Sequence, residues 1–152
     1  MNTTVKADAA TLIAASDIFT AAFQPLKDLE GITCAFTLQA YPVSLLKKCD
    51  NSLGLDESNG PLMSILLLNW WKNKDDDELL LTTFKNALDK IDEDAAKRGT
   101  AVPYKYMNYA FNFQHPIASY GEEMHGRLRE ISKAYDSDGL FQKGVPGGFK
   151  LA

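Results

Sequence analysis

The sequence lacks the features that most simply place a protein in a membrane, in a disulfide scaffold or on a metal ion. Only two cysteines and two histidines occur in 152 residues, without a Cys-x-x-Cys or a Cys/His cluster. Cys34 and Cys49 are therefore predicted to be buried small hydrophobic residues, and no metal site is predicted. The longest apolar run, residues 62–68, is far shorter than the ~20 residues that span a bilayer. With no apolar signal region at its start, the chain is expected to be cytoplasmic and free of a membrane.

Basic stripes and glycine-rich phosphate loops are also missing. The formal net charge is −4 and the 16 Lys and Arg residues are scattered, which argues against nucleic-acid binding. No Gly-x-Gly-x-x-Gly occurs, and the glycine cluster at 144–148 contains Pro146 where helix amides would have to meet a phosphate. The sequence predicts that this chain alone binds no cofactor.

What is present is the composition of one globular domain, with 45% hydrophobic and 24% charged residues. Residues 1–152 are expected to form a single stand-alone module, large enough for its own core. Apolar residues at spacings of three and four predict a helix over 8–27, after a polar leader. The same spacing predicts a helix after the acidic triplet 75–77, ending at Gly99.

Alternating polar and apolar residues predict a strand over 32–41, with one dry and one polar side. The run 61–71 is apolar on both faces, apart from Ser64 and Asn69, and predicts a central strand covered on both sides. A third strand is predicted over 104–110. A capping box at Ser119 predicts a last helix with Leu128, Ile131 and Tyr135 on its inner face. These elements predict an α+β fold, with an antiparallel or mixed sheet covered on one face by helices.

Four segments near the carboxyl terminus occur in a characteristic order: YKYMNYA at 104–110, SYGEE at 119–123, YDSDGLFQ at 135–142 and PGGFKL at 146–151. In order and spacing they resemble the tail of the fungal berberine-bridge-enzyme-like FAD-linked oxidases. The resemblance covers about residues 31–151. It implies the substrate, or cap, domain of that family without the half that holds the flavin.

The resemblance also nominates site residues. In that family the segment matching residues 106–109 lies beside flavin and substrate, which suggests Tyr106 and Asn108 as catalytic residues, with Tyr106 as a neutral donor. The alternative is that they merely anchor a strand edge. Predicted substrate-binding residues on the same sheet surface and its aromatic wall are Thr37, Gln39, Tyr41, Trp70, Trp71 and Tyr104.

These features lead to three expectations for function. The first is a flavin-independent pocket protein that cyclises, isomerises or dehydrates a hydrophobic polyketide- or terpenoid-like fungal metabolite, by orienting it and polarising one carbonyl. The second is the substrate-domain half of a split FAD-linked oxidoreductase, and the third is a non-catalytic ligand-binding remnant. Because the face that packs on the FAD domain in relatives would be exposed, a homodimer through that face is also expected.

Overall fold

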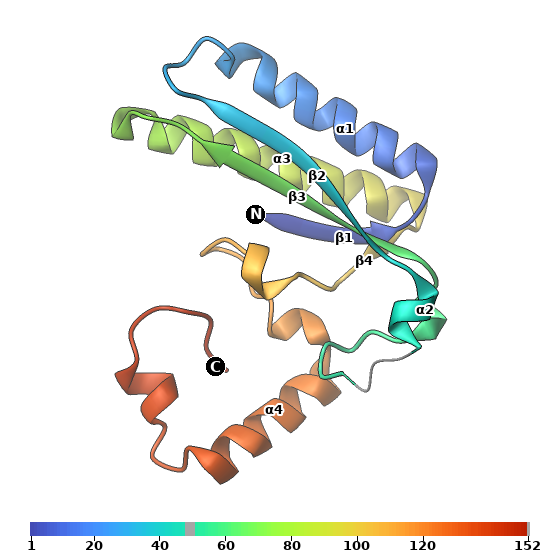
Figure 1. Cartoon of the computed structure of the whole chain (residues 1–152), viewed down its shortest axis with the longest axis vertical. Coiled ribbons are helices and arrows are strands. Elements are labelled where there is room, and N and C mark those ends of the chain that lie inside the picture. The colour runs from blue at the N-terminus through green and yellow to red at the C-terminus, as the bar shows by residue number, and fades with distance from the viewer. Residues whose placement is uncertain (48–50, 152) are drawn as a thin grey trace.

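A computed structural model describes residues 1–47 and 51–151. Its centre is a four-stranded antiparallel sheet with the strand order β2-β3-β1-β4 (Figure 1). The strands are β1 (Asn2–Lys6), β2 (Thr33–Tyr41), β3 (Leu62–Trp70) and β4 (Ala101–Val102). The predicted α+β class and the antiparallel alternative for the sheet are confirmed.

Two long helices, α1 (Ala9–Phe23) and α3 (Asp77–Arg98), cover one face of this sheet (Figure 1). Asp8 starts α1 by accepting a 2.8 Å hydrogen bond from the Thr11 amide, and Pro25 lies in the 3-10 turn that follows the helix. Gly99 ends α3 with φ +70°, the left-handed conformation that favours glycine. Both helices lie where the apolar spacing predicted them.

The main core lies between these helices and the sheet. The rings of Phe19 and Phe84 are 5.7 Å apart, and those of Phe19 and Phe36 are 5.5 Å apart. Residues Ala9–Leu26 are also long and apolar enough to meet the criteria for a membrane-spanning helix. Core helices of soluble domains pass the same test, and Ala15 and Phe19 are buried in this core.

Strand β3 is central, as predicted, because β2 pairs with it on one side and β1 on the other. The prediction that it is covered on both faces is wrong at its carboxyl end. There Leu68 and Trp70 are 36% and 52% exposed, on the face opposite α1 and α3. An apolar run shows that a strand can be buried on both faces, but what covers each face depends on the rest of the fold.

The residues interpreted as a polar leader form β1, a strand that the sequence did not predict. Asn2, Thr3 and Thr4 are at most 1% exposed. The prediction failed because apolar periodicity does not detect a strand whose inward side chains are polar. Here hydrogen bonding compensates the burial of Asn2 and Thr3.

The third predicted strand, residues 104–110, is also wrong. Only β4 joins the sheet, and the chain then leaves it through a 3-10 turn at Met107–Tyr109. The backbone of Tyr106 bonds to the Asn2 side chain instead of a neighbouring strand, at 2.9 Å from its N–H and 3.1 Å to its C=O. Residues 104–110 therefore form no strand.

The last helix, α4 (Glu122–Tyr135), projects away from the sheet together with the carboxyl-terminal tail (Figure 1). Leu128 packs partly against the body of the fold, but the predicted inward positions of Ile131 and Tyr135 are wrong, since they are 44% and 89% exposed. The capping box is also wrong, because Ser119 Oγ accepts from the Lys105 amide at 2.8 Å. Cys34 is half-buried, whereas the prediction for Cys49 lies outside the described residues.

The short elements that remain connect β2 to β3 and end the chain. Helix α2 (Val43–Leu46) and a 3-10 turn at Glu57–Asn59 lie between the two strands, and Leu46 is buried. The tail after α4 contains one π-helical turn, Leu140–Gly144. It returns beside α4, where the Arg129 side chain donates to the carbonyl of Leu151 at 3.3 Å.

Candidate functional site

The sheet face opposite α1 and α3, here called the open face, carries most of the predicted site. Cys34 and Phe36 pack into the helix-side core, so the alternating residues of β2 project to the other side. These are Thr37, Gln39 and Tyr41, which pair with Leu66, Ser64 and Leu62 of β3. The alternation along β2 was thus enough to place three predicted residues on one surface.

Five of the six tyrosines gather at one end of this face, and we call them the tyrosine cluster: Tyr41, Tyr104, Tyr106, Tyr109 and Tyr120. Tyr104 is at the centre, with its ring 6.2 Å from that of Tyr41 in a T-shaped pair and 5.7 Å from that of Tyr120 in a stacked pair. Tyr106 and Tyr109 form a second T-shaped pair at 4.8 Å. Such offset and edge-on pairs are the favourable arrangements of aromatic rings.

Burial keeps the inner phenols of the cluster uncharged. Desolvation, followed by interaction with neighbouring tyrosines, raises the pKa of Tyr104, and desolvation is also the largest cause of the raised pKa of Tyr41 and of Tyr120. A phenol already ionises only near ~10 in water, so these three groups are neutral near neutral pH. They can act as hydrogen-bond donors and acceptors but not as phenolate bases.

The two nominated catalytic residues interact directly. The Asn108 side-chain amide donates to the Tyr106 hydroxyl oxygen at 2.9 Å. This bond occupies a lone pair on that oxygen and leaves the phenolic proton available for another acceptor. In this pair the Asn108 amide orients the Tyr106 hydroxyl, which remains a hydrogen-bond donor.

Hydroxyl groups that the site prediction did not include lie beneath this surface. Thr4 Oγ1 is buried and makes no hydrogen bond to any described residue. Ser64 Oγ and Tyr104 Oη are also buried without a hydrogen bond of normal geometry in the described part of the chain, and each interacts with the Tyr41 hydroxyl. Thr4 and Ser64 are directly paired across β1 and β3. Buried polar groups usually have a partner, so unpaired ones indicate a water or ligand position. In the sequence, the only sign of these buried hydroxyls was Ser64, a polar residue within an apolar strand.

The two tryptophans do not join the cluster. Trp70 is on the open face but pairs with Thr33, eight residues along β2 from Tyr41, which corresponds to about 27 Å. Trp71 is on the helix side of the sheet, where its indole N–H donates to Asp77 Oδ1 at 2.6 Å. Of the two predicted aromatic-wall residues, only Trp70 therefore lies on the same face as the tyrosines.

A hollow of about 210 Å³ lies beside the cluster and is lined by Tyr104, Tyr120, Leu55 and Val102 among others. An adjoining hollow of about 430 Å³ shares Leu55 and Tyr120 with it, and ligand pockets usually enclose about 300–1,000 Å³. The cluster thus supplies one wall and several polar atoms, and both hollows are open to solvent.

Comparison with known proteins gives the class of relatives. No family model and no solved structure matches the chain. Over 106 residues it is 44% identical to the FAD-dependent monooxygenase FUP4 of Fusarium proliferatum, which is 69% of this chain and 20% of that protein. The chain is homologous to part of the fungal FAD-dependent monooxygenases.

Two further fungal relatives also match the chain over only part of their own length. The FAD-dependent monooxygenase sdcF of Emericella nidulans is 40% identical over 99 residues, 65% of this chain and 21% of that protein. The bifunctional solanapyrone synthase of Alternaria solani is 30% identical over 128 residues, 83% of this chain and 25% of that protein. The chain thus spans about a fifth to a quarter of these curated relatives. The narrower resemblance to berberine-bridge enzymes stays a prediction.

The described residues do not fit the pyrophosphate of FAD. Helix amino termini are the usual anion sites, but each of the three long helices begins beside carboxylates: Asp8 at α1, Asp77 and Glu78 at α3, and Glu122 and Glu123 at α4. Negative side chains already stabilise these positive helix ends, so a second anion would be repelled. The amino termini of these three helices therefore offer no site for the pyrophosphate of FAD.

Proposed function

We propose that this chain supplies the substrate-side face of a fungal FAD-dependent oxidoreductase of secondary metabolism, with the flavin held by polypeptide other than these 152 residues. The supporting observation is the open face, where five tyrosines pair with one another and two of them, Tyr104 and Tyr120, line an unclosed hollow. Two of the three relatives are named as FAD-dependent monooxygenases, and all three are four to five times longer than the matched region. A second polypeptide segment that closes the hollow would complete both the pocket and the cofactor site.

The residues of this chain would bind and orient the substrate. Aromatic rings provide apolar contact area for a hydrophobic, polyketide- or terpenoid-like molecule. Tyr106, oriented by Asn108, would donate its proton in a hydrogen bond to a substrate carbonyl or hydroxyl. Gln39 lies about 7 Å along β2 from Tyr41 and is exposed on the same face, where its amide can bind a second polar group.

Complementation tests this proposal. The companion is FUP4 of Fusarium proliferatum from which the 106 matched residues have been deleted, co-expressed with this chain or, as the positive control, with its own deleted segment. We expect the chain and the companion to co-purify with bound flavin, detected by visible absorption. If the deleted segment restores flavin binding but this chain, shown to be folded by circular dichroism, does not, the proposal is wrong.

Charge substitutions on the two surfaces identify the face involved. Trp70→Asp places a carboxylate on the open face and is expected to abolish co-purification. Leu79→Asp is the matched control, since Leu79 is 51% exposed on α3 and Trp70 is 52% exposed. In a restored complex, Tyr106→Phe should lower the turnover of any converted compound by about a hundredfold without loss of flavin.

A second candidate is the flavin-independent catalyst, and the acidic helix starts favour it because the described helix amino termini offer no site for the FAD pyrophosphate. It would use the same tyrosine donors to cyclise, isomerise or dehydrate a substrate, either as a monomer or as a homodimer closed through the open face. Conversion of a compound by the purified chain with no flavin present would support this candidate over the first. Gel filtration of the Trp70→Asp variant would show whether the open face joins two copies.

A further inference from the structure

A relay of two side-chain amides connects Gln114, Asn2 and Tyr106. The Gln114 amide spans the Asn2 backbone, accepting from its N–H at 3.1 Å and donating to its C=O at 2.7 Å. The Asn2 amide spans the Tyr106 backbone in the same way, at 2.9 and 3.1 Å. Each side chain thus makes the pair of bonds that a neighbouring β-strand would otherwise make.

The relay lies at the start of β1, where no described strand pairs with β1 on the β4 side. Strand β4 pairs with β1 only at Thr4 and Val5, so Asn2 at the start of β1 has no strand partner on that side. Asn2 is fully buried and Gln114 is 7% exposed, which means that unpaired backbone groups there would be costly. The amides satisfy these groups and at the same time fix the segment that carries Tyr106.

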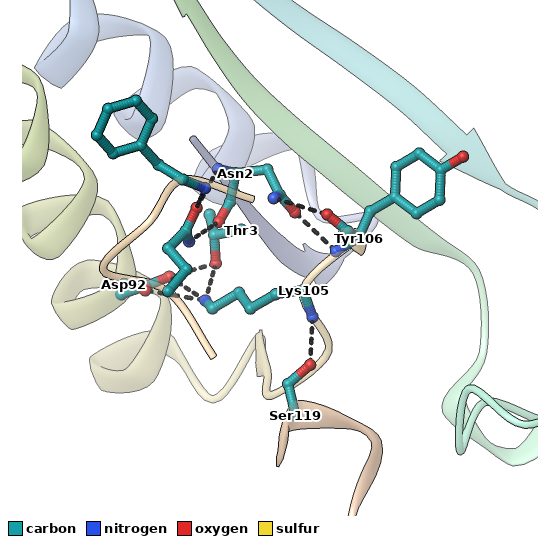
Figure 2. Close-up of polar contacts among 8 residues, drawn as sticks. Asn2, Thr3, Asp92, Lys105, Tyr106 and Ser119 are labelled. Atoms are coloured by element: carbon teal, nitrogen blue, oxygen red, sulfur yellow. Dashed lines mark hydrogen bonds and ion pairs between the residues drawn. The ribbon is translucent and has the colours of Figure 1, made fainter. Parts of the chain in front are cut away.

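A second set of contacts holds the neighbouring residue. The Lys105 ammonium donates to Thr3 Oγ1 at 2.7 Å and to Asp92 Oδ2 at 3.0 Å, while the Lys105 amide donates to Ser119 Oγ at 2.8 Å. Figure 2 shows Lys105 directed into this network and the Tyr106 ring directed away from it, on the opposite side of the backbone. These contacts fix the backbone on the side of Lys105, and the Tyr106 side chain projects from the opposite side.

We propose that Asn2 and Gln114 are positioning residues for Tyr106, which set where its hydroxyl lies on the open face. The importance of that hydroxyl rests on the proposed function, but the positioning itself does not. Asn2 acts through the Tyr106 backbone, and Gln114 acts one step further away, because it bonds to Asn2 and to the Phe111 amide.

The test uses the whole chain with 3-fluorotyrosine at position 106, observed by fluorine NMR. Asn2→Asp and Gln114→Glu each keep the shape of the side chain but replace its amide donor with an oxygen that faces a backbone carbonyl. Both substitutions should therefore shift or broaden the Tyr106 fluorine resonance. Gln114→Ala is a milder variant, because it removes the amide without placing a carboxylate oxygen against the Asn2 carbonyl oxygen. It serves if Asn2→Asp and Gln114→Glu prevent folding.

Two controls separate positioning from general loss of stability. Thr4→Val alters a buried residue of the same strand whose hydroxyl has no hydrogen-bond partner among the described residues. Ile91→Val opens a small gap in the helix-side core, where Ile91 is 1% exposed. Resonance changes beyond those of both controls are the expected result. If every folded Asn2 and Gln114 variant stays within the range of the controls, the positioning role is wrong, whatever the complementation experiment shows.

Discussion

The two faces of the sheet are built in different ways. On the helix side, Leu80, Phe84 and Ile91 of α3 are at most 1% exposed and pack against apolar residues of α1 and the strands. On the open face, a smaller apolar cluster with Leu62 and Val102 packs against stacked tyrosines, and hydrogen bonds of Asn2 and Ser119 hold the chain beside it. Apolar packing distributes stability over many small contacts, whereas the hydrogen bonds of the open face depend on a few specific atoms.

The largest effect should come from the helix side. Phe84→Ala removes a ring that is 1% exposed and 5.7 Å from the ring of Phe19. We expect the free energy of unfolding to fall by about 3–5 kcal/mol, measured by urea denaturation. A loss below about 1 kcal/mol would mean that this core can collapse around the gap and that the two faces differ less than their packing indicates.

Close packing on the open-face side can be tested at Gly54. Its φ is +68°, and an added Cβ would lie 2.1 Å from the carbonyl oxygen of Tyr120. Gly54→Ala should therefore cost more than the ~1–2 kcal/mol of the left-handed conformation alone. Gly60→Ala is the matched control, with φ +72° and no atom within 4 Å of the added Cβ. Equal losses in urea denaturation would exclude a contribution from the contact with Tyr120.

The helix side was largely predictable from sequence because its signals are periodic. The spacing of Ala15 and Phe19 in α1, and of Phe84 and Ile91 in α3, repeats the helical period, and both helices formed as predicted. The alternation in β2 likewise placed Tyr41 on the correct face. These patterns are local, so the sequence contains them whatever the rest of the chain does.

The open face was only partly predictable, since its decisive contacts join distant residues. Asn2 and Tyr106 are 104 positions apart, and no local pattern shows that a side-chain amide will replace a strand there. The resemblance still nominated Tyr106 and Asn108, which the structure places in contact. The resemblance did not show that only one of Trp70 and Trp71 lies on the open face. Trp70 is the last residue of β3 and lies on that face, whereas Trp71 follows the strand and packs on the helix side.

A substitution that raises the free energy of unfolding, rather than lowering it, would sharpen the contrast between the two faces. The buried Tyr104 hydroxyl makes no hydrogen bond of normal geometry to the described residues, and its contact with the Tyr41 hydroxyl compensates its burial only in part, so Tyr104→Phe should raise the free energy of unfolding by up to about 1 kcal/mol. Ser119→Ala is the counterpart, because its hydroxyl accepts from Lys105 at 2.8 Å, and it should lower stability by about 1–2 kcal/mol. If Tyr104→Phe destabilises the protein as Ser119→Ala does, the Tyr104 hydroxyl has a partner such as a bound water.

The smallest expected effect is a dependence on alkaline pH that arises from the open face. Burial raises the pKa of Tyr104, so above the unfolded value of ~10 the unfolded chain releases this proton while the folded protein retains it. The folded state then binds more protons, and its stability falls as pH rises through that region and beyond. Urea denaturation of the wild type at about pH 8 and about pH 11 should show this loss, and Tyr104→Phe should show a smaller one. Equal losses in the two proteins would assign the alkaline effect to groups other than Tyr104.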